Sequence, residues 1–275
     1  MLKKLLSICL LMPTLVMASG DLCDPKTSTI GDCVKEINKQ IKKLEKENQA
    51  QQTEIQALKN RWILTDGLVV YYPFNGNAND VSGNGHHGTV NGATLSKDRF
   101  ENADSAYSFD GSNDKIEIAT TSTLQFVNSS FSFVAWAYLE EYGVERDRPL
   151  LYKATWSGNG NPITDGYQFW YGWKNDLILS KPEKIHTVVS NALNQWKMLV
   201  VTYDVNSQTL RMYADTALEK EVVNSQPIQV TPNSPLYIGY SQNYGGSWFK
   251  GKLDELRIYN RALTDVEIKS LYKHR

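Results

Sequence analysis

The spacing of apolar residues between Val34 and Trp62 predicts a helix with one narrow hydrophobic face. Steps of three and four recur along this segment, which contains neither glycine nor proline. Such a heptad repeat is typical of a coiled coil. The apolar positions are Val34, Ile37, Ile41, Leu44, Ile55, Leu58 and Trp62, with Asn48 and Gln51 in the intervening positions.

We therefore expect residues 34–62 to form a short coiled-coil stalk that joins copies of the chain into a homo-oligomer. The mixed isoleucine and leucine seam leaves dimer and trimer open. The alternative is a lone helix packed on the domain that follows, because the apolar face is narrow and interrupted.

After Trp62 the pattern changes to short segments in which apolar and polar residues alternate, and this predicts strands. The expected strands are 67–74, 106–109, 115–118, 131–138, 167–173, 177–179, 196–203, 210–214, 236–240 and 253–259. The turn Asp110–Asp114 between two of them is typical of a hairpin. A capping box at Thr264 and Glu267 predicts one short helix near the end. Many strands without intervening helices predict an all-β, antiparallel jelly-roll sandwich over residues 63–275.

The last expected strand carries a carboxylate among apolar neighbours. Strict alternation places Asp254 on the same face as Leu256 and Ile258. A carboxylate on an apolar face must be paired, hydrogen-bonded or bound to a cation. The strand therefore either holds an ion or completes a polar network. Alternation places Glu255 and Arg257 on the opposite face, where the two can pair.

The first 18 residues have the pattern of a signal peptide. Lys3 and Lys4 precede an apolar run from Leu5 to Met17, and Ala18 provides a small residue for cleavage. The run is too short to span a bilayer well, and an uncut anchor is the alternative. We expect a secreted protein, periplasmic or extracellular, with no membrane span after cleavage.

Two cysteines remain once the signal peptide, which contains Cys9, is removed. Cys23 and Cys33 lie in a short linker, residues 19–33, and an exported protein meets an oxidising environment. The two are therefore expected to form a disulfide bond. Their spacing leaves open whether the bond closes within one chain or links neighbouring chains.

Charge and composition narrow the range of partners. The chain has 29 basic and 30 acidic residues, so no electrostatic case for nucleic acid arises. Aromatic residues make up 11% of the chain, with 15 Tyr and 7 Trp. Such residues favour strands and also serve as platforms for ligands.

Five motifs in order give the chain a family resemblance. The motifs are Tyr72–Gly76, Asn79–Gly88, Tyr107–Ser112, Phe131–Trp136 and Leu253–Leu263. With them, residues from about Gly67 to Tyr272 resemble the laminin G-like jelly-roll modules of bacterial secreted proteins, in the concanavalin A-like lectin and glucanase superfamily. The resemblance covers about three quarters of the chain and excludes the stalk. It implies a two-sheet sandwich, often a bound calcium, and usually binding without catalysis.

The loop from Asn77 to Gly88 is a candidate calcium site. It is rich in glycine and in oxygen-bearing side chains, and calcium takes six to eight oxygen ligands. We expect Asp80, Ser82 and Asn84 to contribute, together with Asp254 from the last strand. The alternative is a tight turn held by hydrogen bonds from these side chains to the backbone.

Catalytic motifs are weak in this sequence. Retaining glycosidases need two carboxylates about 5–5.5 Å apart. The nearest pair, Glu219 and Glu221, lies in a polar stretch without aromatic neighbours. No Gly-x-Ser-x-Gly motif occurs. We therefore expect a protein without enzymatic activity, and a glycoside-active enzyme is the less favoured reading.

Aromatic side chains in glycine-rich loops are candidates for carbohydrate binding, because a sugar ring presents an apolar face and a polar edge. These are Trp156, Tyr244 and Trp248. In the strand 167–173, alternation separates the two faces. Tyr167, Phe169, Tyr171 and Trp173 share one face, and Gln168 and Trp170 share the other. One face is expected to build the core and the other to line the concave sheet, and alternation does not say which.

Together these patterns predict an exported recognition module without catalysis, stabilised by calcium and multimerised by its stalk. Its partner would be a glycan, and a weak single-site affinity would gain from avidity. The alternative is a structural or adhesive protein that binds a protein partner such as a cell-surface protein.

Overall fold

The computed structural model describes residues 29–142, 147–155, 165–172, 176–181, 183–242 and 245–274, without the side chains of residues 33 and 57–63. The chain divides into two compact units, residues 1–62 and 63–275. The expected signal peptide and Cys23 lie outside the described residues, and so does the side chain of Cys33. The signal peptide and the disulfide bond therefore stay predictions.

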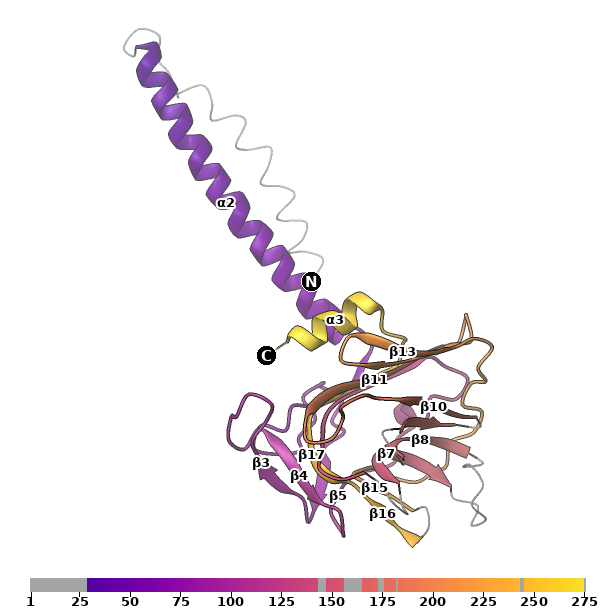
Figure 1. Ribbon diagram of the computed structural model, residues 1–275. Coiled ribbons are helices and arrows are strands. Elements are labelled where there is room, and N and C mark those ends of the chain that lie inside the picture. Colours follow the sequence, from indigo (N-terminus) through magenta and orange to yellow (C-terminus); the bar gives the residue numbers. More distant parts are fainter. Residues whose placement is uncertain are drawn as a thin grey trace. The chain divides into compact units, whose positions relative to one another are not determined.

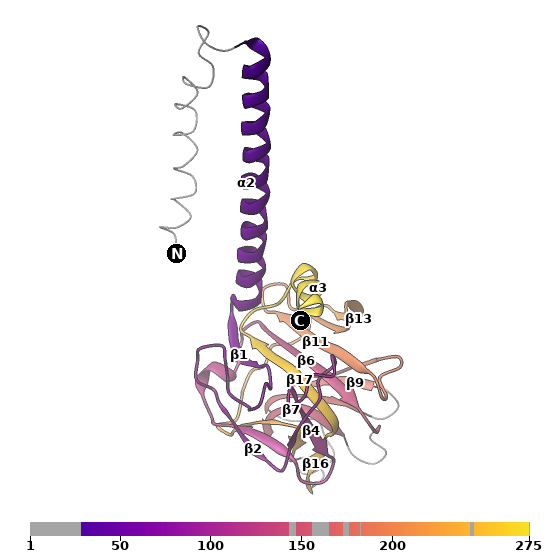
Figure 2. The ribbon, with the colours of Figure 1, turned by 90° about the vertical axis from the view of Figure 1, so that its left-hand side faces the viewer.

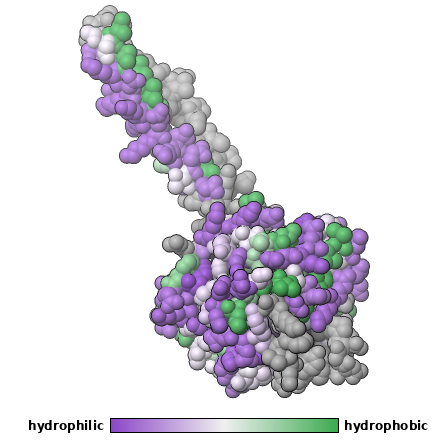
Figure 3. Space-filling model, viewed as in Figure 1, coloured by the Kyte–Doolittle hydropathy of each residue, from purple (hydrophilic) through white to green (hydrophobic). Residues whose placement is uncertain are grey.

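Helix α2 (Ile30–Thr65) confirms the helix expected from the heptad pattern. Its seam positions Val34, Ile37, Ile41 and Leu44 are 42–50% exposed. Figure 3 shows hydrophobic residues in a line along part of this helix. Assembly through the seam stays a prediction. Among the described residues, no helix is both long and apolar enough to cross a membrane.

The second unit is a sandwich of two antiparallel sheets, as the alternating pattern predicted (Figures 1 and 2). The larger sheet contains β1 (Leu68–Tyr72), β3 (Thr94–Ser96), β4 (Ala106–Asp110), β6 (Phe131–Leu139), β11 (Trp196–Asp204), β12 (Thr209–Ala214), β13 (Ala217–Val222) and β17 (Lys250–Tyr259). Their order is β13-β12-β11-β6-β17-β4-β3, and β1 also pairs with β17.

The smaller sheet contains β2 (Gly88–Asn91), β5 (Lys115–Ile118), β7 (Arg148–Thr155), β8 (Asp165–Tyr171), β9 (Asp176–Ser180), β10 (Lys184–Val188) and β14 (Leu236–Ile238). Their order is β10-β9-β8-β7-β14-β5-β2. Strands β15 (Tyr240–Ser241) and β16 (Ser247–Trp248) form a separate two-stranded sheet. A short 3₁₀ helix, η2 (Ser122–Leu124), follows β5, and α3 (Asp265–Lys273) follows β17.

The prediction of a hairpin at Asp110–Asp114 is wrong. Strand β4 before this turn pairs with β3 and β17, whereas β5 after it pairs with β14 and β2. The turn therefore carries the chain from one sheet to the other. It is held by the Asp114 carboxylate, which accepts a hydrogen bond of 2.8 Å from the amide of Asp110. Turn chemistry is local, and it does not determine which sheet the next strand joins.

The main core lies between the two sheets. Phe131 and Phe133 of β6 face Tyr167 and Phe169 of β8, and all four are fully buried. Ring centroids of Phe133 and Tyr167 lie 5.0 Å apart. Burial of one such side chain contributes about 1.5–3 kcal/mol. This alternation places the intervening residues of both strands on the outer faces of the sandwich.

Helix α3 covers part of the outer face of the larger sheet (Figure 1). Its Ile268 and Leu271 belong to a second buried cluster with Val134 and Trp136 of β6. The predicted capping box is present. The Thr264 hydroxyl accepts a hydrogen bond from the Glu267 amide, and the Glu267 carboxylate accepts one from the Thr264 amide.

A β-bulge in β17 overturns the expected face of Asp254. Glu255 has φ of +53°, and the pairing with β6 shifts between Asp254 and Arg257. The extra residue places both Leu253 and Leu256 in the main core. Asp254 instead lies opposite Trp136, on the outer face of the larger sheet. Strict alternation failed here because one inserted residue exchanges the two faces.

Candidate functional site

A row of side chains crosses the outer face of the smaller sheet. Residues directly opposite one another in an antiparallel pair point to the same face of the sheet. The pairing register therefore connects one residue from each of the seven strands. In sheet order from β2 to β10 they are Thr89, Glu117, Tyr237, Tyr152, Gln168, Ser180 and Lys184.

The two faces of β8 confirm the separation expected from alternation. Tyr167, Phe169 and Tyr171 are in the main core, and Gln168 and Trp170 are on the outer face. Residue 173, which was expected to share the face of Tyr167, lies outside the described residues. The outer face thus carries both hydrogen-bonding groups and an indole ring.

Within the part of the chain that the structure describes, the hydrogen-bonding groups of two aromatic side chains on this outer face are buried without a partner. They are the Tyr152 hydroxyl and the Trp170 Nε1, in side chains that are 1% and 3% exposed. Burial raises the pKa of Tyr152, so its hydroxyl remains protonated and can donate. A buried polar group without a partner costs about 1–3 kcal/mol. Neither atom is open to solvent in this structure, so a ligand hydroxyl or a water molecule would reach it only after the surrounding side chains move.

Three aromatic rings lie together beside this row, and we refer to Tyr237, Tyr240 and Trp248 as the aromatic cluster. The Tyr237 and Tyr240 rings meet edge to face with centroids 5.3 Å apart. The Tyr240 and Trp248 centroids lie 4.3 Å apart. All three side chains are partly exposed. Tyr237 is also the register partner of Tyr152, so the cluster adjoins the buried hydroxyl.

The chain reaches the aromatic cluster through a glycine. Gly239, between β14 and β15, has φ of +78°, and a Cβ there would lie 2.5 Å from a ring atom of Phe109. Only glycine fits both the left-handed conformation and the close approach. This bend carries Tyr240 out of the smaller sheet and into the two-residue pairing with β16, where Tyr240 lies opposite Trp248.

The residues expected to bind carbohydrate are only partly described. Trp248 lies in the aromatic cluster, whereas Trp156 and Tyr244 lie outside the described residues. The assignment of these three to a binding site stays a prediction. Sequence reasoning missed Tyr237 and Tyr240. Tyr237 stands between two apolar residues of a short strand, and this alternation is the signal that could have placed it on an outer face.

The expected metal ligands Asp80, Ser82 and Asn84 lie in one tight turn. The Asp80 carboxylate accepts hydrogen bonds from the amides of Tyr71 (3.0 Å), Ser82 (2.9 Å) and His86 (2.9 Å). It accepts a fourth from the Ser82 hydroxyl at 2.9 Å. Burial raises the pKa of Asp80, but these bonds outweigh burial and hold the pKa below its ordinary value.

This turn does not fit a calcium ion while its hydrogen bonds hold. A carboxylate offers about four lone-pair sites, and the four donors occupy those of Asp80. Asn84 is held by its Nδ2, which donates to the Val69 carbonyl at 2.9 Å, and this bond leaves its Oδ1 free of that contact. Among the described residues, no group of three or more His, Cys, Asp or Glu side chains could hold a metal ion. Calcium at this turn stays a prediction, and a bound cation would have to displace at least one donor.

Asp254, the fourth expected ligand, is engaged by a different segment. Its Oδ2 lies 2.6 Å from Nη1 of Arg99, and the side chains are 2% and 7% exposed. Burial and the neighbouring Glu255 raise the pKa of Asp254 to about 7, against the opposing effect of Arg99. The ion pair completes a polar network, which is one of the two roles expected for this carboxylate.

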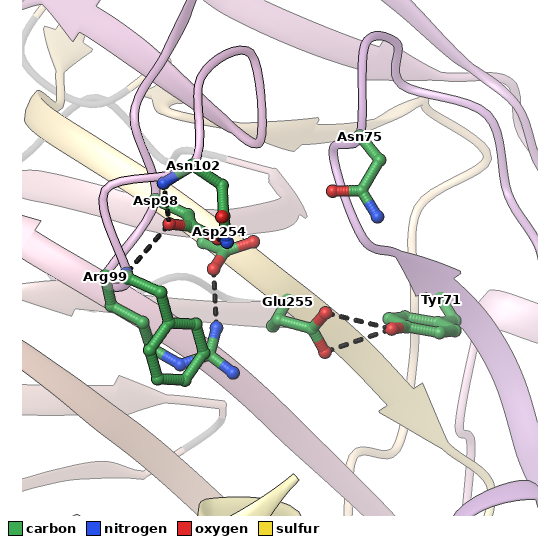
Figure 4. Close-up of a pocket in the computed structure, with 8 residues that line it drawn as sticks. Tyr71, Asn75, Asp98, Arg99, Asn102, Asp254 and Glu255 are labelled. Atoms are coloured by element: carbon green, nitrogen blue, oxygen red, sulfur yellow. Dashed lines mark hydrogen bonds and ion pairs between the residues drawn. The ribbon is translucent and has the colours of Figure 1, made fainter. Parts of the chain in front are cut away.

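A pocket of about 410 Å³ lies around Asp254 (Figure 4). Its floor includes Glu255, whose carboxylate accepts a hydrogen bond from the Tyr71 hydroxyl and pairs with Arg257 at 2.5 Å. This pairing of Glu255 with Arg257 was expected from the sequence. The pocket, which we call the Asp254 pocket, is lined by Tyr71, Asn75, Asp98, Arg99, Phe100, Asn102, Asp254 and Glu255.

Comparison with known proteins agrees with this architecture. A family profile described as the concanavalin A-like lectin/glucanases superfamily matches residues 110–269. No curated protein sequence matches the chain. The match covers strands of both sheets of the sandwich.

Solved structures share the fold at low identity. The binding domain of Paraclostridial Mosquitocidal Protein 1 has a TM-score of 0.59 at 20% identity, over 76% of this chain and 52% of that chain. A botulinum neurotoxin serotype D ligand binding domain in complex with N-acetylneuraminic acid has 0.56 at 14%, over 76% and 51%. Domain 4 of AbnA, a GH43 extracellular arabinanase from Geobacillus stearothermophilus, in complex with arabinotriose, has 0.51 at 19%, over 75% and 98%. This chain thus spans about half the length of the toxin domains.

Proposed function

We propose, because the chain belongs to the concanavalin A-like lectin/glucanases superfamily, that it is a binding module without catalytic activity that recognises carbohydrate on the outer face of the smaller sheet. The observation that carries this proposal is the aromatic cluster of Tyr237, Tyr240 and Trp248 beside the buried Tyr152 hydroxyl. A sugar needs an apolar platform and nearby hydrogen-bonding groups, and this surface offers both.

The charges beside the aromatic cluster support an uncharged or weakly charged sugar. Lys115 Nζ lies 3.2 Å from Glu117 and 4.9 Å from the centroid of the Tyr237 ring. The two opposite charges compensate one another, so the surface has no strong preference for an ionic ligand. The complex of one protein with this fold with arabinotriose, a neutral sugar, is consistent with this preference. The complex of another with N-acetylneuraminic acid, an anion, is consistent with carbohydrate binding but not with the preference for an uncharged sugar.

The absence of catalysis is part of the same proposal. Glu219 and Glu221, the nearest candidate acids in the sequence, lie in β13 at the edge of the larger sheet. The Glu221 carboxylate pairs with Arg211 at 2.5 Å. Both are exposed and lie in a different sheet from the residues of the aromatic cluster, which supports binding over hydrolysis.

The proposal also includes export of the protein and its assembly into oligomers through α2. The exposed seam of α2 is suited to a second copy of the same helix, because 42–50% of each of four large apolar side chains is in contact with water. Copies joined in this way would bind a glycan surface through several weak sites at once, with a gain in avidity. The signal-peptide pattern at the N-terminus supports a location outside the cytoplasm.

A glycan array probed with the mature protein, with and without calcium, tests the proposal. We expect binding to a restricted set of glycans, and weaker binding by Trp248→Ala. Capture of a protein partner by the wild type, without any signal on the array, would instead support the adhesive alternative. A signal that requires calcium would support the predicted calcium site.

A further inference from the structure

We propose that the Asp254 pocket binds a neutral saccharide unit, at a site separate from the aromatic cluster. The pocket belongs to the larger sheet and its loops, whereas the aromatic cluster adjoins the smaller sheet. Its volume of about 410 Å³ lies within the range of about 300–1,000 Å³ that small-molecule sites have.

The walls of the pocket are held in place before any ligand arrives. The Asp98 carboxylate accepts hydrogen bonds from the amides of Phe100 (2.8 Å) and Asn102 (2.9 Å) and from Asn102 Nδ2 (2.8 Å). A second loop is clipped to this one, because the Gly76 amide donates to the Asp104 carbonyl at 2.7 Å. A preformed site of this kind loses little conformational entropy when it binds.

Two of the three carboxylates of the pocket are compensated in charge. Asp254 pairs with Arg99, and Glu255 pairs with Arg257. Asp98 is stabilised by three N–H donors, which do not neutralise its charge. The pocket therefore keeps about one negative charge, and an anion would be repelled. The choice between a neutral ligand and a cation depends on the hydrogen-bonding groups.

The same carboxylates retain lone pairs for hydroxyl groups. A carboxylate has about four lone-pair sites. Asp98 accepts three hydrogen bonds, and Asp254 accepts one from Arg99 and one from the Glu255 amide. Each can therefore accept at least one further O–H donor. A saccharide carries several such donors on neighbouring carbons, which matches a pocket with acceptors on more than one side.

Other residues that line the pocket provide a hydrogen-bond donor and an apolar surface, which the carboxylates do not. Asn75 is exposed, and Figure 4 shows its amide directed toward the space between Asp254 and Tyr71. An amide both donates and accepts, so it can bond to a sugar hydroxyl in either sense. Phe100, which is 45% exposed and also lines the pocket, provides an apolar surface. This combination of amide, carboxylate and aromatic ring defines a polar site for a sugar ring.

Saturation-transfer NMR on the full chain tests the inference, with the methyl glycosides of glucose, galactose, mannose and N-acetylglucosamine as probes. We expect at least one to bind, and Asn75→Ala to weaken that binding about tenfold. Asn75→Trp should abolish it by filling the pocket. Asn91→Ala, at an exposed asparagine on the smaller sheet, is the matched control and should bind as the wild type does.

The outcome separates this inference from the proposed function. Binding that is lost in Asn75→Trp and retained in Trp248→Ala supports the pocket, whatever the aromatic cluster does. The inference is overturned if none of the four glycosides binds, or if binding depends on Trp248 and not on Asn75. Binding of n-butylamine that is blocked by Asn75→Trp, without binding of any glycoside, would also overturn it in favour of a cationic ligand.

Discussion

Arg99 and Asp254 form a buried ion pair across 155 positions of the sequence, with Nη1 2.6 Å from Oδ2. The Arg99 guanidinium also lies between two rings, 4.4 Å from the centroid of Phe100 and 4.6 Å from that of Trp136. The Nη2 of Arg99 donates to the His274 carbonyl at 3.0 Å. One side chain thus connects a loop, the last strand and the segment after α3.

Removal of Arg99 should destabilise the sandwich strongly. Arg99→Met keeps much of the aliphatic bulk but leaves Asp254 buried without its partner. Loss of one member of a buried pair costs about 3–5 kcal/mol, and we expect a value near the lower limit because the Asp254 carboxyl can take up a proton. Urea unfolding at pH 8 measures the change in free energy of unfolding.

The double variant Arg99→Met/Asp254→Asn provides the control. It should be more stable than the sum of the two single changes predicts, because the unpaired charge is gone. Additive effects would show that the two residues do not interact energetically.

The pH dependence of stability should show the raised pKa of Asp254. Its pKa in the folded protein is about 7, against an ordinary value of 3.8. Between these values the folded state binds the proton more tightly than the unfolded state, so this group lowers the free energy of unfolding as pH rises from about 4 to 7. Above pH 7 its contribution is constant.

Asp254→Asn removes this titration. The difference in free energy of unfolding, wild type minus variant, should therefore fall from pH 4 to pH 7 in chemical denaturation. A difference that is flat over this interval, and that rises with pH only below about pH 4, would show that Arg99 outweighs burial and depresses the pKa.

Asp80→Ala should destabilise the protein by about 2–3 kcal/mol, because three backbone amides and one hydroxyl lose a charged acceptor. Thermal unfolding with calcium and with a chelator measures this loss. We expect the same loss in both conditions, since the hydrogen bonds require no metal. If the chelator lowers the midpoint of the wild type and leaves that of Asp80→Ala unchanged, calcium holds the turn.

Trp248→Ala should weaken glycan binding about tenfold, because the stacked surface with Tyr240 is lost. Isothermal titration with a glycan selected on the array measures the affinity. Trp196→Ala is a matched control, since Trp196 is also partly buried and packs against another aromatic ring, that of Tyr138, in the larger sheet. Equal weakening by both variants would indicate a general loss of structure.

A further prediction concerns assembly through the coiled-coil stalk, residues 34–62. Ile41→Glu places a charge in the middle of the exposed seam of α2 and should convert the oligomer into a monomer. Analytical ultracentrifugation at micromolar concentration measures the mass. Gln40→Glu, a change next to the seam, should leave the assembly intact. A wild-type protein that sediments as a monomer would contradict the stalk itself.

The periodicity of the sequence was sufficient to predict several features of this protein. The three-four spacing located α2, strict alternation located the strands of the core and separated the two faces of β8, and Thr264 with Glu267 located the start of α3. These features depend on contacts within a few residues or on burial of one face. Strands β2, β3, β7, β10, β13 and β16 were missed. Strand β7 contains Pro149 next to a register shift, and β13 has little burial to create alternation.

Other features depend on which distant segments meet. The turn Asp110–Asp114 has the chemistry of a hairpin, yet it connects two sheets, because the partners of β4 and β5 lie far away in the sequence. The bulge at Glu255 exchanges the faces of β17 through one extra residue, and no local pattern announces it. Arg99 meets Asp254 only once the loop and the last strand have packed together. Local periodicity encodes the elements, whereas long-range pairing assigns each polar residue its partner, and so the Asp254 pocket and the aromatic cluster became visible only in the folded chain.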